Sequence, residues 1–326
     1  VAVATFAAIV LSRPLALLVA APFLAAWFVS PALARWISLP QRPPSVAPTM
    51  EQHAYLRAVA RKTWAFFDVH VGPEDHWLPP DNVQLDPAPA VAHRTSPTNM
   101  GLALLANLGA RDFGYLSMSR LLERTGHGLG TMALLERHRG HFYNWYDTHS
   151  LQPLRPLYVS SVDSGNLAGH LLALRMGLLE LIDQPIFSGA SLDGLRDTLR
   201  LLKEAMDGNT QDIDDLMHAL ATASTVTSSQ VLDLLQKQHD GATALVATHA
   251  DASHGDTAFW SKQFLDQCTD MLADARWLHL DPSLGAGRLG DRIADPDRQA
   301  LSPVRLELLF NARVLGSSPD FLPAVS

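Results

Sequence analysis

The hydrophobic residues of this chain follow two different patterns. Residues 14–34 form an uninterrupted run without a charged side chain, bounded on each side by an arginine. About 20 such residues cross a bilayer core. We therefore predict a transmembrane segment over residues 1–38, either a single helix or a hairpin in which residues 1–11 form an earlier span. A cleaved signal peptide or a buried helix is the alternative, but a signal peptide begins with a basic region and ends in small residues before the cut.

A proline-rich linker, residues 39–50, comes after the apolar run. Its sequence LPQRPPSVAPTM contains four prolines, a composition typical of extended connecting segments. We expect a folded domain over residues 51–282 and a separate tail over residues 283–326. Because the chain opens inside an apolar run without a methionine, we expect it to be a piece of a longer protein.

Helical periodicity dominates the residues after the linker. Apolar positions recur at helical spacing from Tyr55 to the Gly72-Pro73 breaker, and Ser96 followed by Pro97 is a helix-start signal. Further helices are predicted over residues 116–137, 166–182, 192–206, 212–238 and 257–278. Residues 166–182 are apolar almost all round, which predicts a buried helix. No stretch alternates with period two for long enough to predict a sheet, so the expected fold class is all-α.

Two connections are much longer than the 2–8 residues usual between packed helices. Residues 72–95 and 140–160 are rich in aromatic, Asn, Asp and His side chains. Long loops that are not of low complexity usually carry function. Paired helices with such loops gathered at one mouth are typical of an (α/α) barrel, whereas a plain helical bundle with disordered loops is the alternative.

Charge and cysteine content narrow the classes of function. The net charge is −8, which argues against nucleic acid as a partner. One cysteine, Cys268, excludes an internal disulfide and a cysteine-built metal cluster and fits a reducing compartment. The first 48 residues contain three arginines and no acid. Arg35 and Arg42, just after the apolar run, favour a cytoplasmic location for the folded domain beyond the linker.

The densest cluster of candidate chemistry is GHFYNWYDT. Sugars present apolar C–H faces ringed by hydroxyl groups, so their sites combine aromatic rings with Asp, Asn and His side chains. This segment supplies both kinds, and the candidate substrate-binding residues in it are His141, Tyr143, Asn144, Trp145 and Tyr146, beside Asp147. The alternative interpretation is that the aromatic residues only anchor the loop on the core.

A second polar segment, YVSSVDSGNLAGH, leads into the apolar residues 166–182. Asp163 or Ser164 can cap that helix, and Asn166 and His170 lie one turn apart on the same face. Unpaired polar groups inside an apolar helix cost about 1–3 kcal/mol each, so Asn166 and His170 are expected to bond each other or to face a polar cavity. An upstream segment adds the candidates Asp81, Asn82, Arg94 and Asn99.

Other polar motifs are weaker candidates. The glycines at 126, 128 and 130 lack the preceding strand and following Lys of a phosphate loop. His138 and His141 are expected at a basic helix end, which disfavours a cation. A further set could ligate a metal by residue type but is surrounded by loop-forming residues: His249, Asp251, His254 and Asp256. We therefore predict no metal site and no cofactor.

Three segments together resemble the central region of cyclic β-1,2-glucan synthases: PPDNVQLDPAPAVAHRTSPTNMGL, RGHFYNWYDT and YVSSVDSGNLAGHL. The resemblance covers roughly residues 39–181 and weakens toward residue 282. Members of this family are very large proteins of the bacterial inner membrane. An N-terminal glycosyltransferase domain extends a β-1,2-glucan from UDP-glucose, a middle domain cyclises it by transglycosylation, and a C-terminal phosphorylase-like domain trims its length. The resemblance implies a membrane hairpin followed by an incomplete (α/α)6 barrel, with the soluble part in the cytoplasm.

The resemblance also implies a mechanism. A cyclising transglycosylase is expected to be retaining, with two carboxyl groups about 5–5.5 Å apart. Asp147 and Asp163 are the acids inside the matched motifs and hence the candidate catalytic residues, although we favour them as ligands of sugar hydroxyls, with the family's catalytic glutamates further downstream. The implied partners are β-1,2-glucan, membrane lipid through residues 1–38 and the remaining synthase domains. A non-catalytic glucan-binding module and a free-standing glycoside hydrolase remain the alternatives.

Overall fold

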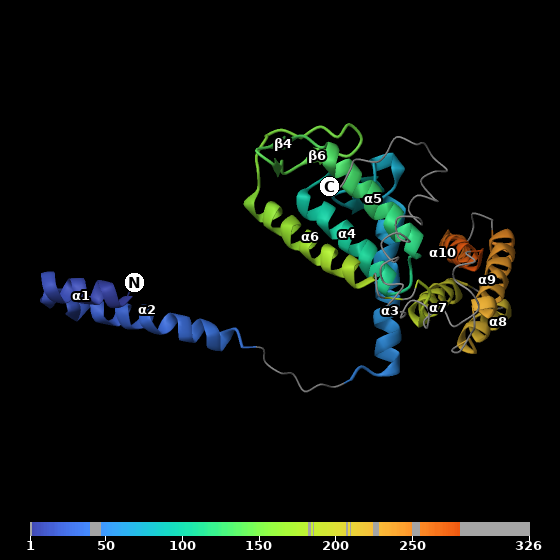
Figure 1. Ribbon diagram of the computed structural model, residues 1–326, viewed down its shortest axis with the longest axis horizontal. Helices are drawn as coiled ribbons and strands as arrows, with labels where there is room; N and C mark the ends of the chain where they lie inside the picture. Colours follow the sequence, from blue (N-terminus) through green and yellow to red (C-terminus); the bar gives the residue numbers. More distant parts are fainter. Residues whose placement is uncertain are drawn as a thin grey trace. The chain divides into compact units, whose positions relative to one another are not determined.

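The computed structural model describes residues 2–39, 47–181, 184, 186–206, 208, 210–223, 228–249 and 255–280. The described residues are predominantly helical, which confirms the predicted all-α class. The chain divides into two compact units, Val1–Gln52 and His53–Ser326. Figure 1 shows the ribbon of both units.

The N-terminal unit is a pair of apolar helices. Helix α1 (Ala2–Ser12) is followed by a short 3-10 turn, η1 (Pro14–Ala16), and by α2 (Leu17–Ile37), and the two helices lie side by side (Figure 1). The stretch Pro14–Ile37 has 24 residues and a mean hydropathy of 2.0, and only 6% of its apolar window is buried. It is therefore long and apolar enough to cross a membrane, and its exposure distinguishes it from the core helix of a soluble domain.

The first helices of the second unit pack around α4. They are α3 (Met50–His70), α4 (Pro97–Asp112), α5 (Met118–Leu134) and α6 (Ser161–Leu181), with a 3-10 turn, η2 (Pro73–Asp75), after α3. Helix α4 packs against both α5 and α6. Buried apolar side chains fill the space between these helices and the long loops: Leu78, Met100, Leu104, Met132, Leu135, Tyr146, Leu167 and Leu174.

The predicted start of α4 is confirmed. The Ser96 side chain accepts a hydrogen bond from the Asn99 backbone N–H at 3.3 Å, and Pro97 occupies the first helical position. The sequence correctly identified this cap because Ser and Pro act on their immediate neighbours, without help from tertiary contacts.

Replacing Ser96 with Ala is expected to lower the free energy of unfolding by about 1 kcal/mol, because the Asn99 N–H loses its acceptor at a buried helix start. Urea denaturation of the full chain in detergent micelles measures the change. Ser96→Thr, which keeps a hydroxyl acceptor, is the matched control. Equal stability of the Ala and Thr variants would show that the cap contributes nothing.

Helix α6 differs from its prediction in two ways. It begins at Ser161, so Asp163 and Ser164 lie within its first turn, and the Ser160 hydroxyl accepts the Asp163 N–H at 3.1 Å instead. The predicted burial all round is also wrong for the described structure, since Leu172 is 67% and Met176 is 60% exposed. The helix covers α4 with one face only, and a composition that is apolar all round does not say which faces have a neighbour.

The second half of the unit contains α7 (Gly189–Ala205), α8 (Gln211–Ala221), α9 (Ser228–Thr248) and α10 (Gly255–Leu280). Helix α10 packs against α7 and α9, with buried Leu195, Leu199, Leu235 and Phe264 among the core residues. The single helix predicted over residues 212–238 is wrong, because α8 ends at Ala221 and α9 begins at Ser228.

Three two-stranded antiparallel ladders organise the long loops. Strand β1 (Val83–Gln84) pairs with β2 (Ala90–Val91), β3 (Arg94–Thr95) with β6 (Tyr146–Asp147), and β4 (Arg137–His138) with β5 (His141–Phe142). His138 and His141 therefore face each other across a hairpin and not along a helix end. The β3–β6 ladder joins the two long loops, which are far apart in the sequence.

The glycines at 126, 128 and 130 lie inside the continuous helix α5. His127 stacks on Trp77 with ring centroids 5.0 Å apart, and the backbone oxygen of Trp77 lies over Gly128. Small residues here let the loop after η2 approach the helix closely.

Candidate functional site

The β3–β6 ladder places polar side chains from five segments of the chain in one connected group. Asp81 and Asn82 precede β1, Arg94 lies in β3, and Thr98 and Asn99 lie in the first turn of α4. Asn144 and Trp145 precede β6, and Asp163 and Asn166 lie near the start of α6. We call this group the polar cluster: Asp81, Asn82, Arg94, Thr98, Asn99, Asn144, Trp145, Asp163 and Asn166.

Asp81 is the acceptor at one end of the polar cluster. Its Oδ2 accepts hydrogen bonds from Arg94 Nη2 at 2.9 Å, Arg94 Nε at 3.2 Å and Asn82 Nδ2 at 3.0 Å. Asn99 Nδ2 donates to Oδ1 at 3.4 Å. The Arg94 side chain remains 51% exposed, so this end of the group reaches solvent.

Trp145 and Asn144 connect the two ends. The Arg94 guanidinium carbon lies 5.1 Å from the centroid of the Trp145 ring, a cation–π contact. The buried Asn144 amide is oriented so that its oxygen accepts from the Trp145 indole N–H at 2.7 Å and the Tyr158 hydroxyl at 2.6 Å. Its nitrogen then donates to Asp163 Oδ2 at 2.9 Å.

Asp163 is the acceptor at the other end of the polar cluster. Its Oδ1 accepts from the Thr98 hydroxyl at 2.7 Å, and Thr98 Oγ1 in turn accepts from Asn166 Nδ2 at 3.1 Å. Because Thr98 adjoins Asn99, which bonds Asp81, the contacts form a closed ring through α4. Side chains held by several partners at once lose little further freedom when a ligand binds, so the polar cluster is a preorganised surface.

The electrostatics of the two predicted acids are similar. Burial alone raises the pKa of Asp163, but hydrogen bonds from Ser160, Thr98 and Ser96 outweigh it and hold the pKa below its ordinary value. Hydrogen bonds from the Ser150 backbone and hydroxyl hold the pKa of Asp147 below its ordinary value. Both carboxyl groups are therefore ionised at neutral pH and act as hydrogen-bond acceptors.

A stretch of 188 residues is 40% identical to the cyclic β-(1,2)-glucan synthase NdvB of Rhizobium meliloti (strain 1021). The resemblance to cyclic β-1,2-glucan synthases is confirmed. The match covers 57% of this chain and 7% of the relative, so the chain spans a small part of that protein's length. No protein-family model matches the chain.

Several residues predicted from the synthase motifs lie outside the polar cluster. Tyr146 is fully buried, and its hydroxyl accepts the Tyr143 N–H and donates to the Glu136 carbonyl. Tyr146 is therefore part of the buried core in the described structure. Tyr143 packs beside it, with ring centroids 6.5 Å apart.

Asp147 organises a turn. Its Oδ1 accepts from the Ser150 N–H at 2.7 Å, the His149 N–H at 3.1 Å and the Ser150 hydroxyl at 2.9 Å. Its backbone pairs with that of Arg94 across β3–β6. The carboxylate thus acts on the loop after β6, and its side-chain bonds do not include the polar cluster among the described residues.

The remaining residues predicted to bind substrate, His141, Ser164 and His170, also lie outside the polar cluster. His141 is exposed on the β4–β5 hairpin, and Ser164 lies in the first turn of α6. His170 packs on α4 at Gly101, where a Cβ would lie 2.3 Å from its Nδ1, and this buried nitrogen has no hydrogen-bond partner among the described residues. Of the two arrangements expected for Asn166 and His170, a bond between them is not found among the described residues, since Asn166 bonds Thr98.

Sequence reasoning missed Thr98, Tyr158 and Ser160, which hold the cluster together. Ser160 carried a signal, since Ser followed three residues later by an acid is a helix-start pattern. The Thr98 and Tyr158 contacts join positions 65 and 14 residues apart, and no local pattern reports such pairs.

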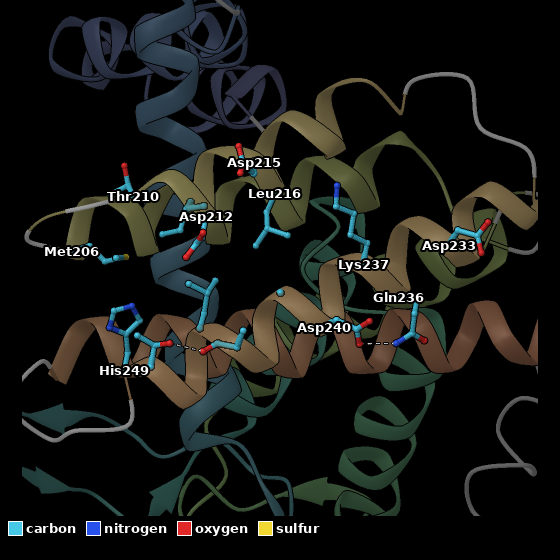
Figure 2. Close-up of a pocket in the computed structure, with 15 residues that line it drawn as sticks. Met206, Thr210, Asp212, Asp215, Leu216, Asp233, Gln236, Lys237, Asp240 and His249 are labelled. Carbon is cyan, nitrogen blue, oxygen red and sulfur yellow. Dashed lines mark hydrogen bonds between the residues drawn. The ribbon is translucent and has the colours of Figure 1, made fainter.

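A pocket of about 730 Å³ lies elsewhere, between α8 and α9 (Figure 2). Asp212, Asp215, Asp233 and Asp240 line it together with Lys237, and His249 and Met206 lie at one end. Apart from His249 none of its lining residues is aromatic, so it lacks the flat rings that sugar sites use. His249 was predicted as a weak metal candidate with Asp256, but Asp251 and His254 lie outside the described residues.

Proposed function

We propose that this chain is part of the glucan-handling domain of a membrane-associated cyclic β-1,2-glucan synthase, and that the polar cluster binds linear β-1,2-glucan. The observation that carries the proposal is the closed ring of contacts from Asp81 through Arg94, Trp145, Asn144 and Asp163 back to α4. These side chains come from the segments on which the family resemblance rests.

The chemistry of the cluster suits a neutral polyhydroxylated ligand. Asp81 and Asp163 offer carboxyl oxygens that accept hydrogen bonds from sugar hydroxyls, while Arg94, Asn82 and Asn166 offer donors at exposed positions. The indole of Trp145 supplies apolar ring surface of the kind that packs on sugar C–H groups. Hydrogen bonds to charged groups contribute about 1.5–3 kcal/mol each, so a few such contacts support a specific complex.

The proposed role in the reaction is binding and orientation of the chain that is to be cyclised by retaining transglycosylation. A proton donor in such a reaction needs a raised pKa, whereas the pKa values of Asp163 and Asp147 are both lowered. The lowered pKa values argue against the proton-donor role, and the hydrogen bonds that Asp163 and Asp147 make lead us to propose hydroxyl binding for Asp163 and loop organisation for Asp147. The acid and the nucleophile are expected among the family's downstream glutamates.

The same proposal places the chain in the parent protein. Residues 51–282 would contribute helices to an (α/α)6 barrel, residues 1–38 would contact lipid of the inner membrane, and the soluble part would face the cytoplasm. The apolar stretch Pro14–Ile37 and the match to NdvB support membrane association. Fusion of a reporter enzyme after residue 282 tests the orientation. Reporter activity in the cytoplasm would support the proposal, and reporter activity in the periplasm would contradict it.

Replacement of Arg94 with Ala or of Asp163 with Asn is expected to weaken binding of linear β-1,2-glucan about 10- to 100-fold, since each removes a charged partner of the sugar and opens the ring of contacts. Isothermal titration of the full chain in detergent measures the change. Arg175→Ala, an exposed arginine of α6, is the matched control. Undiminished affinity in both cluster variants would contradict the assignment.

One incubation tests which reaction the chain performs by itself. The full chain is mixed with linear β-1,2-glucan, and the products are analysed by mass spectrometry. Cyclic products or redistributed chain lengths indicate a transglycosylase, binding without turnover indicates a glucan-binding module of a larger synthase, and release of new reducing ends indicates a hydrolase.

A further inference from the structure

Beside the polar cluster, three ligand-type side chains from separate segments converge on one point. Asp75 ends η2, His93 immediately precedes β3, and His149 comes shortly after β6. One donor atom of each, Asp75 Oδ1, His93 Nδ1 and His149 Nε2, lies within 4.8 Å of the other two. No local sequence pattern reveals this group, because its three members lie far apart along the chain.

We propose that Asp75, His93 and His149 form a binding site for one divalent transition-metal ion such as Zn²⁺. His93 Nδ1 lies 2.8 Å and His149 Nε2 lies 3.4 Å from Asp75 Oδ1. Tetrahedral zinc with bonds of about 2.0–2.1 Å separates its ligand atoms by about 3.3–3.5 Å. Small side-chain rotations therefore suffice to admit the ion.

The ligand set favours a transition metal over magnesium or calcium. Two imidazoles and one carboxylate suit zinc and its neighbours, whereas magnesium and calcium prefer oxygen donors throughout. Three protein ligands leave a fourth position for water, the arrangement of an open site. The His93 and His149 side chains are 41% and 55% exposed, so solvent and an ion have direct access.

The surroundings hold the three ligands in place. The Asp75 side chain is only 10% exposed and accepts a hydrogen bond from the Thr148 hydroxyl. The Thr148 N–H donates to the His93 carbonyl at 3.1 Å, and His76 Nδ1 lies 2.9 Å from the Thr148 carbonyl oxygen. Such outer contacts orient metal ligands and are a normal part of metal sites.

The proposed metal site adjoins the polar cluster. His93 adjoins Arg94, and the residues of β6 connect Trp145 to Thr148. An ion bound by Asp75, His93 and His149 would fasten together the two loops that carry Arg94 and Trp145. Metal binding is measured without glucan, so this inference stands or fails independently of the proposed function.

The test is titration of the metal-free full chain with Zn²⁺ in a calorimeter, together with Co²⁺ absorption spectroscopy. We expect one bound ion and the visible bands of tetrahedral or five-coordinate cobalt. His93→Ala and His149→Ala are each expected to lower zinc affinity about 100-fold or more. His138→Ala, an exposed histidine on the β4–β5 hairpin, should bind zinc as the unaltered chain does.

Two results would overturn the proposal. One is the absence of zinc binding in the unaltered chain, and the other is unchanged affinity in the His93→Ala, His149→Ala double variant. X-ray absorption of the zinc-loaded unaltered chain keeps the proposal testable even where a variant does not fold. We expect a shell of two imidazole nitrogens with oxygen ligands, and a shell without imidazole would contradict the assignment.

Discussion

Replacement of Gly114 with Ala is expected to lower the free energy of unfolding by about 4 kcal/mol or more, among the largest effects of a single substitution. Gly114 lies just after α4 with a φ of 79°, in the left-handed region that costs an L-residue about 1 kcal/mol or more. A Cβ there would lie 1.8 Å from the Ala190 carbonyl oxygen at the start of α7. Because the obstacle is backbone, helix α7 must move before any side chain fits.

Urea denaturation of the full chain in detergent micelles measures this loss. Gly109→Ala is the matched control, since Gly109 lies in α4 and a Cβ there would meet nothing within 4 Å. That variant should gain about 0.5–1 kcal/mol, because Ala favours the helix over Gly. Similar stabilities for the two variants would show that the close approach of this turn to α7 is not present.

Replacement of Arg61 with Ala is expected to cost about 3–5 kcal/mol of unfolding free energy. Arg61 is 1% exposed, and it donates to the Thr198 hydroxyl at 2.8 Å and to Gln263 Oε1 at 2.9 Å. Its guanidinium also lies over the rings of Tyr115 and Trp260. Truncation leaves a cavity and unpaired polar groups where α3, α7 and α10 meet.

A second substitution separates packing from charge at this position. Burial lowers the pKa of Arg61 to about 10, which means that the charge itself opposes folding at neutral pH. Arg61→Met keeps most of the volume without the charge, so it should cost only about 1–2 kcal/mol. Lys62→Ala, at an exposed neighbouring position, should change stability by no more than about 0.5 kcal/mol. A Met variant as unstable as the Ala variant would assign the stabilisation to the guanidinium contacts.

Several features that depend on neighbours in the sequence were predicted correctly. Helical periodicity gave the all-α class, the Ser96-Pro97 signal gave the start of α4, and the length of the apolar run gave the membrane-type helix α2. Other predictions from the local pattern failed. The pattern over residues 212–238 did not show a break between α8 and α9, and the apolar composition of α6 did not show which of its faces is covered.

The motifs for the candidate site likewise indicated residues with different positions in the fold. The motifs indicated Asp81, Arg94, Asn144, Trp145 and Asp163, which the fold brings together, because these residue types suit sugar hydroxyls, and they equally indicated Tyr146, which the fold buries. Aromatic composition alone cannot tell a sugar-binding ring from a core ring, since both are large and apolar with a polar edge.

The sequence by itself determined the helical class, the membrane-type segment, the family resemblance and the kinds of side chain available for glucan. Only the tertiary structure decided which of them meet. The β3–β6 ladder pairs Arg94 with Asp147, which lie far apart along the chain, and this pairing builds both the polar cluster and the Asp75, His93 and His149 group. Residue types and local propensities follow from the sequence alone, whereas metal coordination and ligand binding depend on distances of a few ångströms that only folding sets.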